Sequence, residues 1–213
     1  YLTDLFGPFK IILVMNYFSQ LREHKINEHV AKIRHDWGES DAKRDEGKTT
    51  PDTILRFDNI LYATDDKWQI LDVYKPKNYE EKLPVIVNVH GGGWIYGTKE
   101  VYQFYCMSLA EKGFAVVNFN YHLAPENKYP SSLEDTNNVF KWILKNQEVY
   151  NFDCDNIFAV GDSAGANLLA LYAAVLTNNS LQKDYAFDFP QELKLKAIGL
   201  NCGKYNMRKF DLV

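Results

Sequence analysis

The 213-residue sequence predicts an α/β fold in which helices cover both faces of a mostly parallel sheet. Two observations carry this prediction. Nearly continuous apolar runs, such as Val85–Val89 and Phe114–Phe119, are typical of parallel strands that are buried on both faces. Segments of helical length separate these runs, as crossover connections between parallel strands require.

The first part of the chain contains the elements that precede the parallel strands. Apolar residues at helical spacing predict two short amphipathic helices within residues 9–36. Charged residues together with Gly47 indicate a flexible loop over residues 39–51. Leu55–Ala63 and Trp68–Tyr74 are rich in β-forming residues and flank a turn-forming tetrapeptide, which predicts a hairpin.

Four strand units follow this hairpin. The predicted strands are Val85–Val89, Phe114–Phe119, Asn156–Val160 and Leu195–Leu200, and the predicted helices are Val101–Lys112, Ser131–Tyr150 and Ala164–Thr177. Ligands of open α/β sheets bind beyond the carboxyl ends of the strands. The residues that directly follow each strand are therefore the candidates for chemistry.

Composition excludes several classes of protein. A hydrophobic share of 46% with 24% charged residues is that of a core-forming globular protein. The net charge of −4 offers no basic surface for nucleic acid. The longest apolar run, Phe9–Phe18, is too short to span a bilayer, so no stable membrane insertion is expected.

The cysteine pattern bears on cofactors and on the compartment. The three cysteines are far apart in the sequence and show no spacing typical of a zinc site or a disulfide framework. A reducing, cytoplasmic location is therefore predicted, with no metal and no cofactor. The expected partner is a small molecule, because nothing in the charge pattern points to a macromolecule.

The segment Gly161–Gly165 matches the pattern G-x-S-x-G and lies between a predicted strand and a predicted helix. A sharp strand-to-helix turn would strain the backbone of Ser163 and present its hydroxyl group at the N-terminus of the helix. The glycines at both ends of the motif leave room for this turn. The alternative is an ordinary serine N-cap in a glycine-rich turn.

The segment His90–Trp94 contains three consecutive glycines and directly follows the predicted strand Val85–Val89. Glycines let backbone N–H groups face a substrate with no side chain in the way, as an oxyanion hole for acyl transfer requires. The competing interpretation is a phosphate-binding loop. It is disfavoured because no Lys-Ser or Lys-Thr pair follows the glycines.

The chain from Ile54 to Gly203 resembles the hormone-sensitive-lipase-like branch of the α/β-hydrolase fold, a group of carboxylesterases. The motifs that carry the resemblance are His90–Trp94, Tyr121–Glu126, Tyr129–Pro130, Leu133–Asp135 and Gly161–Asn167. The resemblance implies a lipase-like serine hydrolase that works through an acyl-enzyme intermediate.

The same resemblance implies a role for each motif residue. Ser163 would be the acyl nucleophile, and the backbone N–H groups of Gly92, Gly93 and Ala164 would form the oxyanion hole. His90, Gly91, Gly161, Asp162 and Gly165 would support these groups, with Asp162 as a structural hydrogen-bonding residue rather than the catalytic acid. Within a single domain of residues 1–213, residues 1–37 would form a helical cap over the acyl pocket, 54–203 the core, and 204–213 the start of a further segment.

Two features depart from the family pattern. This chain has His122 where the family usually carries arginine, which puts the family's ion pair near the site in question. All five histidines, His24, His29, His35, His90 and His122, precede Ser163. The triad order in this fold is serine, then acid, then histidine. The catalytic acid and base are therefore expected outside this sequence, together with roughly 60 residues that would complete the sheet.

Three functional hypotheses remain open from the sequence. The first is an esterase that acts on small acyl esters. The second is a receptor-like protein that binds a small molecule and has lost the catalytic histidine. The third is an inactive fragment whose last strand leaves an apolar edge uncovered. The resemblance also allows a homodimer.

Overall fold

The computed structural model describes residues 2–206, with side chains from residue 19 onward. The chain forms two compact units, Tyr1–Glu46 and Gly47–Val213. The first unit contains one continuous helix, α1 (Leu2–Asp45). Over the part of the chain that is described, no helix is long and apolar enough to cross a bilayer.

Two sequence predictions for this unit are wrong, because α1 is not two short helices and it extends through half of the expected loop. Residues 19–25 contain no proline or glycine, so nothing interrupts the helix where a break was predicted. The charged end is itself helical, and Arg44 pairs there with Asp41 at 2.7 Å. Gly47, at a φ of +76°, follows the end of the helix. The role of residues 1–37 as a cap stays a prediction.

The second unit is built on a six-stranded sheet with the order β1-β2-β4-β3-β5-β6. The strands are β1 (Ile54–Leu61), β2 (Ile70–Pro76), β3 (Leu83–Val89), β4 (Ala115–Phe119), β5 (Phe152–Asp162) and β6 (Leu195–Asn201). The first two strands pair antiparallel, which confirms the predicted hairpin. β3, β4, β5 and β6 run parallel to one another, as the apolar runs predicted.

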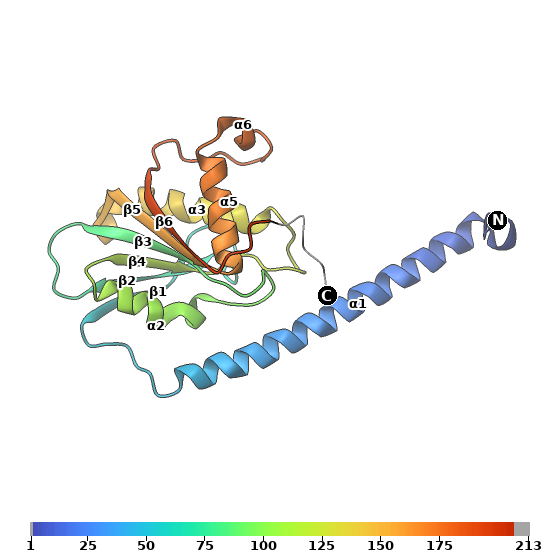
Figure 1. Cartoon of the computed structure of the whole chain (residues 1–213), viewed down its shortest axis with the longest axis horizontal. Coiled ribbons are helices and arrows are strands. Elements are labelled where there is room, and N and C mark those ends of the chain that lie inside the picture. Colours follow the sequence, from blue (N-terminus) through green and yellow to red (C-terminus); the bar gives the residue numbers. More distant parts are fainter. Residues whose placement is uncertain (1, 207–213) are drawn as a thin grey trace. The chain divides into compact units, whose positions relative to one another are not determined.

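Helices cover both faces of this sheet (Figure 1). α2 (Lys99–Ala110) packs on one face, where its buried Met107 lies in a cluster with Ile86 and Val116. α3 (Ser131–Lys145) and α5 (Ala164–Leu176) contribute to the larger cluster on the other face. The mostly parallel α/β architecture predicted from the sequence is confirmed.

Two short helices, one after Asn146 and one before the last strand, were not predicted from the sequence. The expected single helix over residues 131–150 is interrupted at Asn146, and a short helix, α4 (Gln147–Tyr150), follows it. The last predicted strand, β6, lies at the edge of the sheet, and its apolar residue Leu200 is 37% exposed. A second short helix, α6 (Asn179–Gln182), lies in the connection that leads to β6.

Candidate active site

The two glycine-containing motifs lie side by side at the carboxyl ends of neighbouring strands. β3 and β5 pair in parallel, and Val89 is in register with Gly161. The loop His90–Trp94 leaves β3 at this point, and Ser163 leaves β5 at the same edge. The topology therefore brings together segments that are about seventy residues apart in sequence, at the edge where α/β proteins bind ligands.

Ser163 occupies a strained turn between β5 and α5. Its φ of +50° and ψ of −111° are unusual for a residue with a side chain, and the residue is exposed. Its backbone N–H donates to the carbonyl of Asn201 at 2.8 Å, and its carbonyl accepts from Asn167 at 3.1 Å. The side chain makes no capping hydrogen bond, so the alternative interpretation as an ordinary N-cap is wrong.

The glycines at both ends of this turn are required by close backbone contacts. A Cβ atom on Gly165 would lie 2.0 Å from the carbonyl oxygen of Val89, and one on Gly161 would lie 2.6 Å from that of Gly165. Both distances are far below van der Waals contact. Any side chain at these positions would move α5 away from the sheet and displace Ser163 with it.

The loop after β3 is also held in a glycine-dependent conformation. Gly92, Gly93 and Gly97 have φ values of +119°, +60° and +104°. The carbonyl of Gly92 accepts hydrogen bonds from the N–H groups of Ile95 and Tyr96 at 3.1 and 2.9 Å. The turn is therefore tight and internally bonded, and Gly92 and Gly93 place no Cβ atom beside their own N–H groups.

Asp162, the residue before Ser163, connects the two motifs. Its carboxylate accepts a hydrogen bond of 2.6 Å from the hydroxyl group of Tyr102 on α2. The same carboxylate group lies 3.1 Å from where a Cβ atom on Gly91 would be. Asp162 thus contacts both the glycine loop and α2. These contacts agree with the structural hydrogen-bonding role expected for Asp162.

His90 is fully buried at the start of the glycine loop. Its ring stacks on Tyr121 with a centroid separation of 4.1 Å, and its Nδ1 lies 2.7 Å from the carbonyl oxygen of Gly91. The hydroxyl group of Tyr121 donates to the His90 carbonyl at 2.9 Å. Burial lowers the pKa of His90 to about 4, so the ring is neutral at pH 7. This side chain fixes the loop and is not available as a base.

His122 contacts two carboxylates at the position where its replacement of arginine put the family's ion pair in question. Its Nδ1 lies 2.8 Å from Oδ2 of Asp135, and its Nε2 lies 3.5 Å from Oδ2 of Asp65. Gln69 donates to the second oxygen of Asp135 at 2.8 Å. Burial raises the pKa of Asp135, although hydrogen bonds from Gln69 and His122 oppose this shift.

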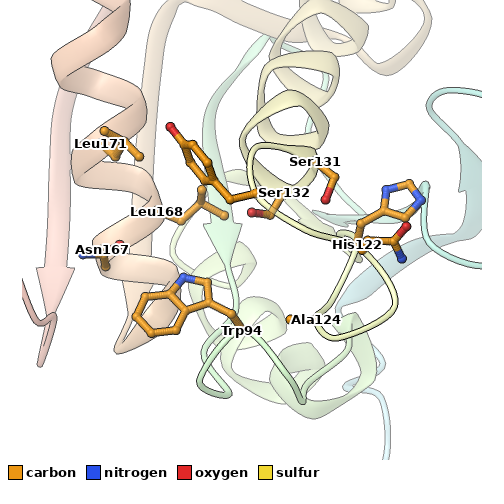
Figure 2. Close-up of a pocket in the computed structure, with 10 residues that line it drawn as sticks. Trp94, His122, Ala124, Ser131, Ser132, Asn167, Leu168 and Leu171 are labelled. Carbon is orange, nitrogen blue, oxygen red and sulfur yellow. The ribbon is translucent and has the colours of Figure 1, made fainter. Parts of the chain in front are cut away.

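A pocket of about 350 Å³ adjoins the two motifs (Figure 2). Asn167, Leu168 and Leu171 of α5 line one side, and the start of α3 lines the other. Trp94, which directly follows the three glycines, forms part of its wall. The remaining lining residues are His122, Ala124, Asn127, Tyr129, Ser131 and Ser132. The exposed surface of the walls is mainly apolar, and polar side chains come from α3, from α5 and from the segment between β4 and α3.

Residues 19–206 contain five histidines, His24, His29, His35, His90 and His122. No hydrogen bond joins any of the described histidines to the Ser163 hydroxyl group. His24 and His35 pair with Glu28 and Glu39 within α1, and His90 and His122 are engaged as described above. The same part of the chain contains no cluster of acidic, histidine or cysteine residues that could hold a metal ion.

Sequence reasoning missed several residues that hold this site. It did not predict that the hydroxyl group of Tyr102 would bond to Asp162. It also assigned no role to Lys99, which forms a buried ion pair with Asp72. The residues around Lys99 gave no signal for this pair, because its partner lies on a strand 27 residues earlier.

The fold and the arrangement of its motifs are those of the α/β-hydrolase esterases. Esterase B from Lactobacillus rhamnosis has a similar structure, with a TM-score of 0.76 and 26% identity over 83% of this chain and 57% of that protein. Versiconal hemiacetal acetate esterase from Dothistroma septosporum is 38% identical over 53% of this chain and 33% of its own length. Carboxylesterase NlhH from Mycobacterium tuberculosis is 34% identical over 59% of this chain and 41% of its own length.

The family profile named BD-FAE matches residues 71–212, and the chain belongs to this family. These relatives confirm the resemblance to hormone-sensitive-lipase-like carboxylesterases that the sequence motifs indicated. The chain spans only about a third to two fifths of the length of the curated relatives it matches.

Proposed function

We propose that this chain is the nucleophile-bearing part of a serine carboxylic ester hydrolase. The observation that carries the proposal is the strained, exposed Ser163 at the N-terminus of α5, beside the glycine loop that follows β3. This arrangement places the hydroxyl group of Ser163 and the backbone N–H groups of the glycine loop at one edge of the sheet. Acyl transfer through a serine nucleophile needs both.

In the proposed reaction, the Ser163 oxygen attacks the carbonyl carbon of the ester and a histidine takes the hydroxyl proton. The backbone N–H groups of Gly92, Gly93 and Ala164 stabilise the negative charge on the carbonyl oxygen. The alcohol leaves with the proton from the histidine, and an acyl-enzyme forms. Water then attacks the acyl group, the histidine takes a proton from it, and the acid is released as Ser163 regains its proton.

The histidine and its carboxylate partner are proposed to come from residues outside this sequence. Within the unit that contains Ser163, His90 and His122 have other partners, and the esterases of similar structure are longer than this chain. The proposed substrate is a small acyl ester, because the pocket of about 350 Å³ beside Trp94 and Leu168 is mainly apolar and limited in volume.

The proposal is tested by replacing Ser163 in the protein produced from the full open reading frame. We expect that protein to hydrolyse p-nitrophenyl acetate or butyrate, and Ser163→Ala to lower kcat by roughly 10⁴-fold or more, because no nucleophile remains. Ser180→Ala is the matched control, since Ser180 is exposed and lies outside the site. Unchanged turnover in Ser163→Ala would refute the assignment of the nucleophile.

The receptor-like alternative makes a different prediction for the same protein. A protein that has lost its catalytic histidine would bind a small molecule but would show no turnover and no pre-steady-state burst. The sequence that encodes the residues after Val213 decides between the two functions. An acidic residue followed by a histidine supports the hydrolase, and the absence of both supports a binding protein.

A further inference from the structure

A buried polar network at the C-terminal end of the glycine loop, where α2 begins, has no role in the function proposed above. Its centre is Lys99, the first residue of α2, which is only 2% exposed. The Nζ atom of Lys99 lies 3.0 Å from Oδ1 of Asp72 on β2. Glu100 provides a second, more exposed carboxylate at 2.5 Å. A charged lysine at this depth has to be compensated by such partners.

The backbone of Lys99 is held by side chains as well. Its N–H group donates to Oδ1 of Asn120 at 2.6 Å, and its carbonyl accepts from Nδ2 of Asn118 at 2.6 Å. Asn118 is in turn bonded by Asn88 of β3 at 3.0 Å. Residues from β3, from β4 and from just beyond β4 therefore fix the position of this one residue.

Asp72 has partners other than Lys99 that hold it in place. The hydroxyl group of Tyr74 donates to it at 2.8 Å, and so does the backbone N–H of Asn59 at 2.8 Å. Asn59 lies in the irregular part of β1 and has a φ of +57°. The carboxylate is thus a rigid acceptor fixed by the sheet, not a mobile surface group.

The position of Lys99 matters because the glycine loop ends there. The loop begins at His90, which Tyr121 and the Gly91 carbonyl hold, and it reaches α2 at Lys99. The left-handed glycines between these points have little intrinsic conformational preference. The position of their N–H groups therefore depends on how firmly both ends of the loop are anchored.

We propose that the Lys99–Asp72 ion pair is a positioning device that holds the C-terminal end of the oxyanion loop against the sheet. This inference rests on the proposed function, since it assigns the loop to transition-state stabilisation. Lys99 does not contact substrate in this role and acts through Gly92 and Gly93. Its loss would misplace donors that bind the oxyanion and would affect the transition state more than the bound ester.

The test compares Lys99→Met with Lys99→Arg and with the double variant Asp72→Asn/Lys99→Met. Removing one partner of a buried pair leaves an uncompensated charge and can prevent folding. The double variant leaves no such charge, and the side-chain amide that Asp72→Asn introduces can still bond to Tyr74 and Asn59. Lys82→Met is the matched control, because Lys82 forms an exposed pair with Glu148 at 2.6 Å.

In the full-length protein we expect the double variant to lower kcat for p-nitrophenyl butyrate about tenfold or more, with KM within about twofold of the wild type. The kcat of Lys99→Arg should be closer to that of the wild type, because arginine keeps the charge and the hydrogen-bond donors of lysine. Hydrogen exchange should become faster in the peptide that covers residues 90–98 and stay unchanged in the peptide that covers residues 164–176.

A folded double variant with unchanged kcat and unchanged exchange in residues 90–98 would overturn the proposal. A rise in KM alone would also overturn it, because that result indicates lost substrate binding. If Ser163→Ala shows that the protein is not a hydrolase, the proposed function fails by itself. The exchange of residues 90–98 in the folded variant still decides whether Lys99 positions the loop.

Discussion

The Nδ1 atom of His122 lies 2.8 Å from Oδ2 of Asp135, and the Asp135 side chain is only 1% exposed. The backbone N–H of His122 donates to the same oxygen at 2.7 Å. This pair ties the segment after β4 to the N-terminal part of α3. The two segments flank the pocket beside Trp94, so the pair helps to fix the shape of that pocket.

We expect His122→Ala to lower the free energy of unfolding by about 1–3 kcal/mol, because Asp135 loses a hydrogen-bond partner while it stays buried. His122→Arg should cost less, since a guanidinium can pair with Asp135 and Asp65 together. Urea unfolding at pH 7 measures both. His35→Ala is the control, because its pair with Glu39 is exposed and should contribute less than about 0.5 kcal/mol. If His122→Arg were less stable than His122→Ala, the result would contradict the stabilising contact assigned to residue 122 and Asp135.

Gly165→Ala should destabilise the protein by about 3 kcal/mol or more and abolish any activity of Ser163. Its Cβ atom would lie 2.0 Å from the Val89 carbonyl oxygen and 2.4 Å from that of His90, and backbone atoms at both places cannot move independently. The control is Gly38→Ala in α1, where no atom lies within 4 Å. That change should be neutral or stabilising by roughly 0.5–1 kcal/mol. Thermal and urea unfolding compare the two, and equal stability would show that α5 tolerates displacement from β3.

Burial of His90 predicts a pH dependence of stability. Its pKa is lowered to about 4 in the folded protein, compared with an unperturbed value near 6.5. Below about pH 6.5 the unfolded chain therefore binds a proton that the folded protein excludes, and stability is lost as the pH falls toward 4. The loss attributable to His90 should be on the order of 3 kcal/mol, at about 1.4 kcal/mol per pH unit.

Urea unfolding at pH 7, 6, 5 and 4.5 measures this effect. The His90→Gln variant should lose less stability than the wild type over this range, because the titrating group is absent. His24→Gln should follow the wild type, since the ring of His24 is exposed in a pair with Glu28. If the free energy of unfolding fell equally with pH in the wild type and in His90→Gln, the result would show that folding does not lower the pKa of His90.

The pocket beside Trp94 predicts a preference for acyl-chain length. Leu171→Ala should shift the ratio of kcat/KM from p-nitrophenyl acetate toward p-nitrophenyl hexanoate, and Leu171→Phe should shift it the other way. Each buried methylene contributes about 0.8 kcal/mol, which corresponds to roughly fourfold in kcat/KM. Leu181→Ala is the control, because Leu181 is 40% exposed and does not line the pocket. Identical chain-length profiles in all variants would place the acyl group elsewhere.

The sequence alone was sufficient to predict the elements around the site. Apolar runs of strand length predicted β3 and β4, and the G-x-S-x-G pattern between a strand and a helix predicted the turn at Ser163. It was not sufficient for α1, because apolar spacing suggested two helices and charged residues suggested a loop. Local charge pairs and the absence of a breaker over residues 19–25 make that segment one helix.

The sequence by itself determined where glycine is required and which residue carries the candidate nucleophile, because these depend on backbone sterics within a few positions of the chain. Only the tertiary structure decided which side chains hold them in place. Asp72 and Lys99 are 27 residues apart, and Tyr102 and Asp162 are 60 apart. No local pattern specifies such partners, since their proximity arises from the strand order and from the packing of α2 on the sheet.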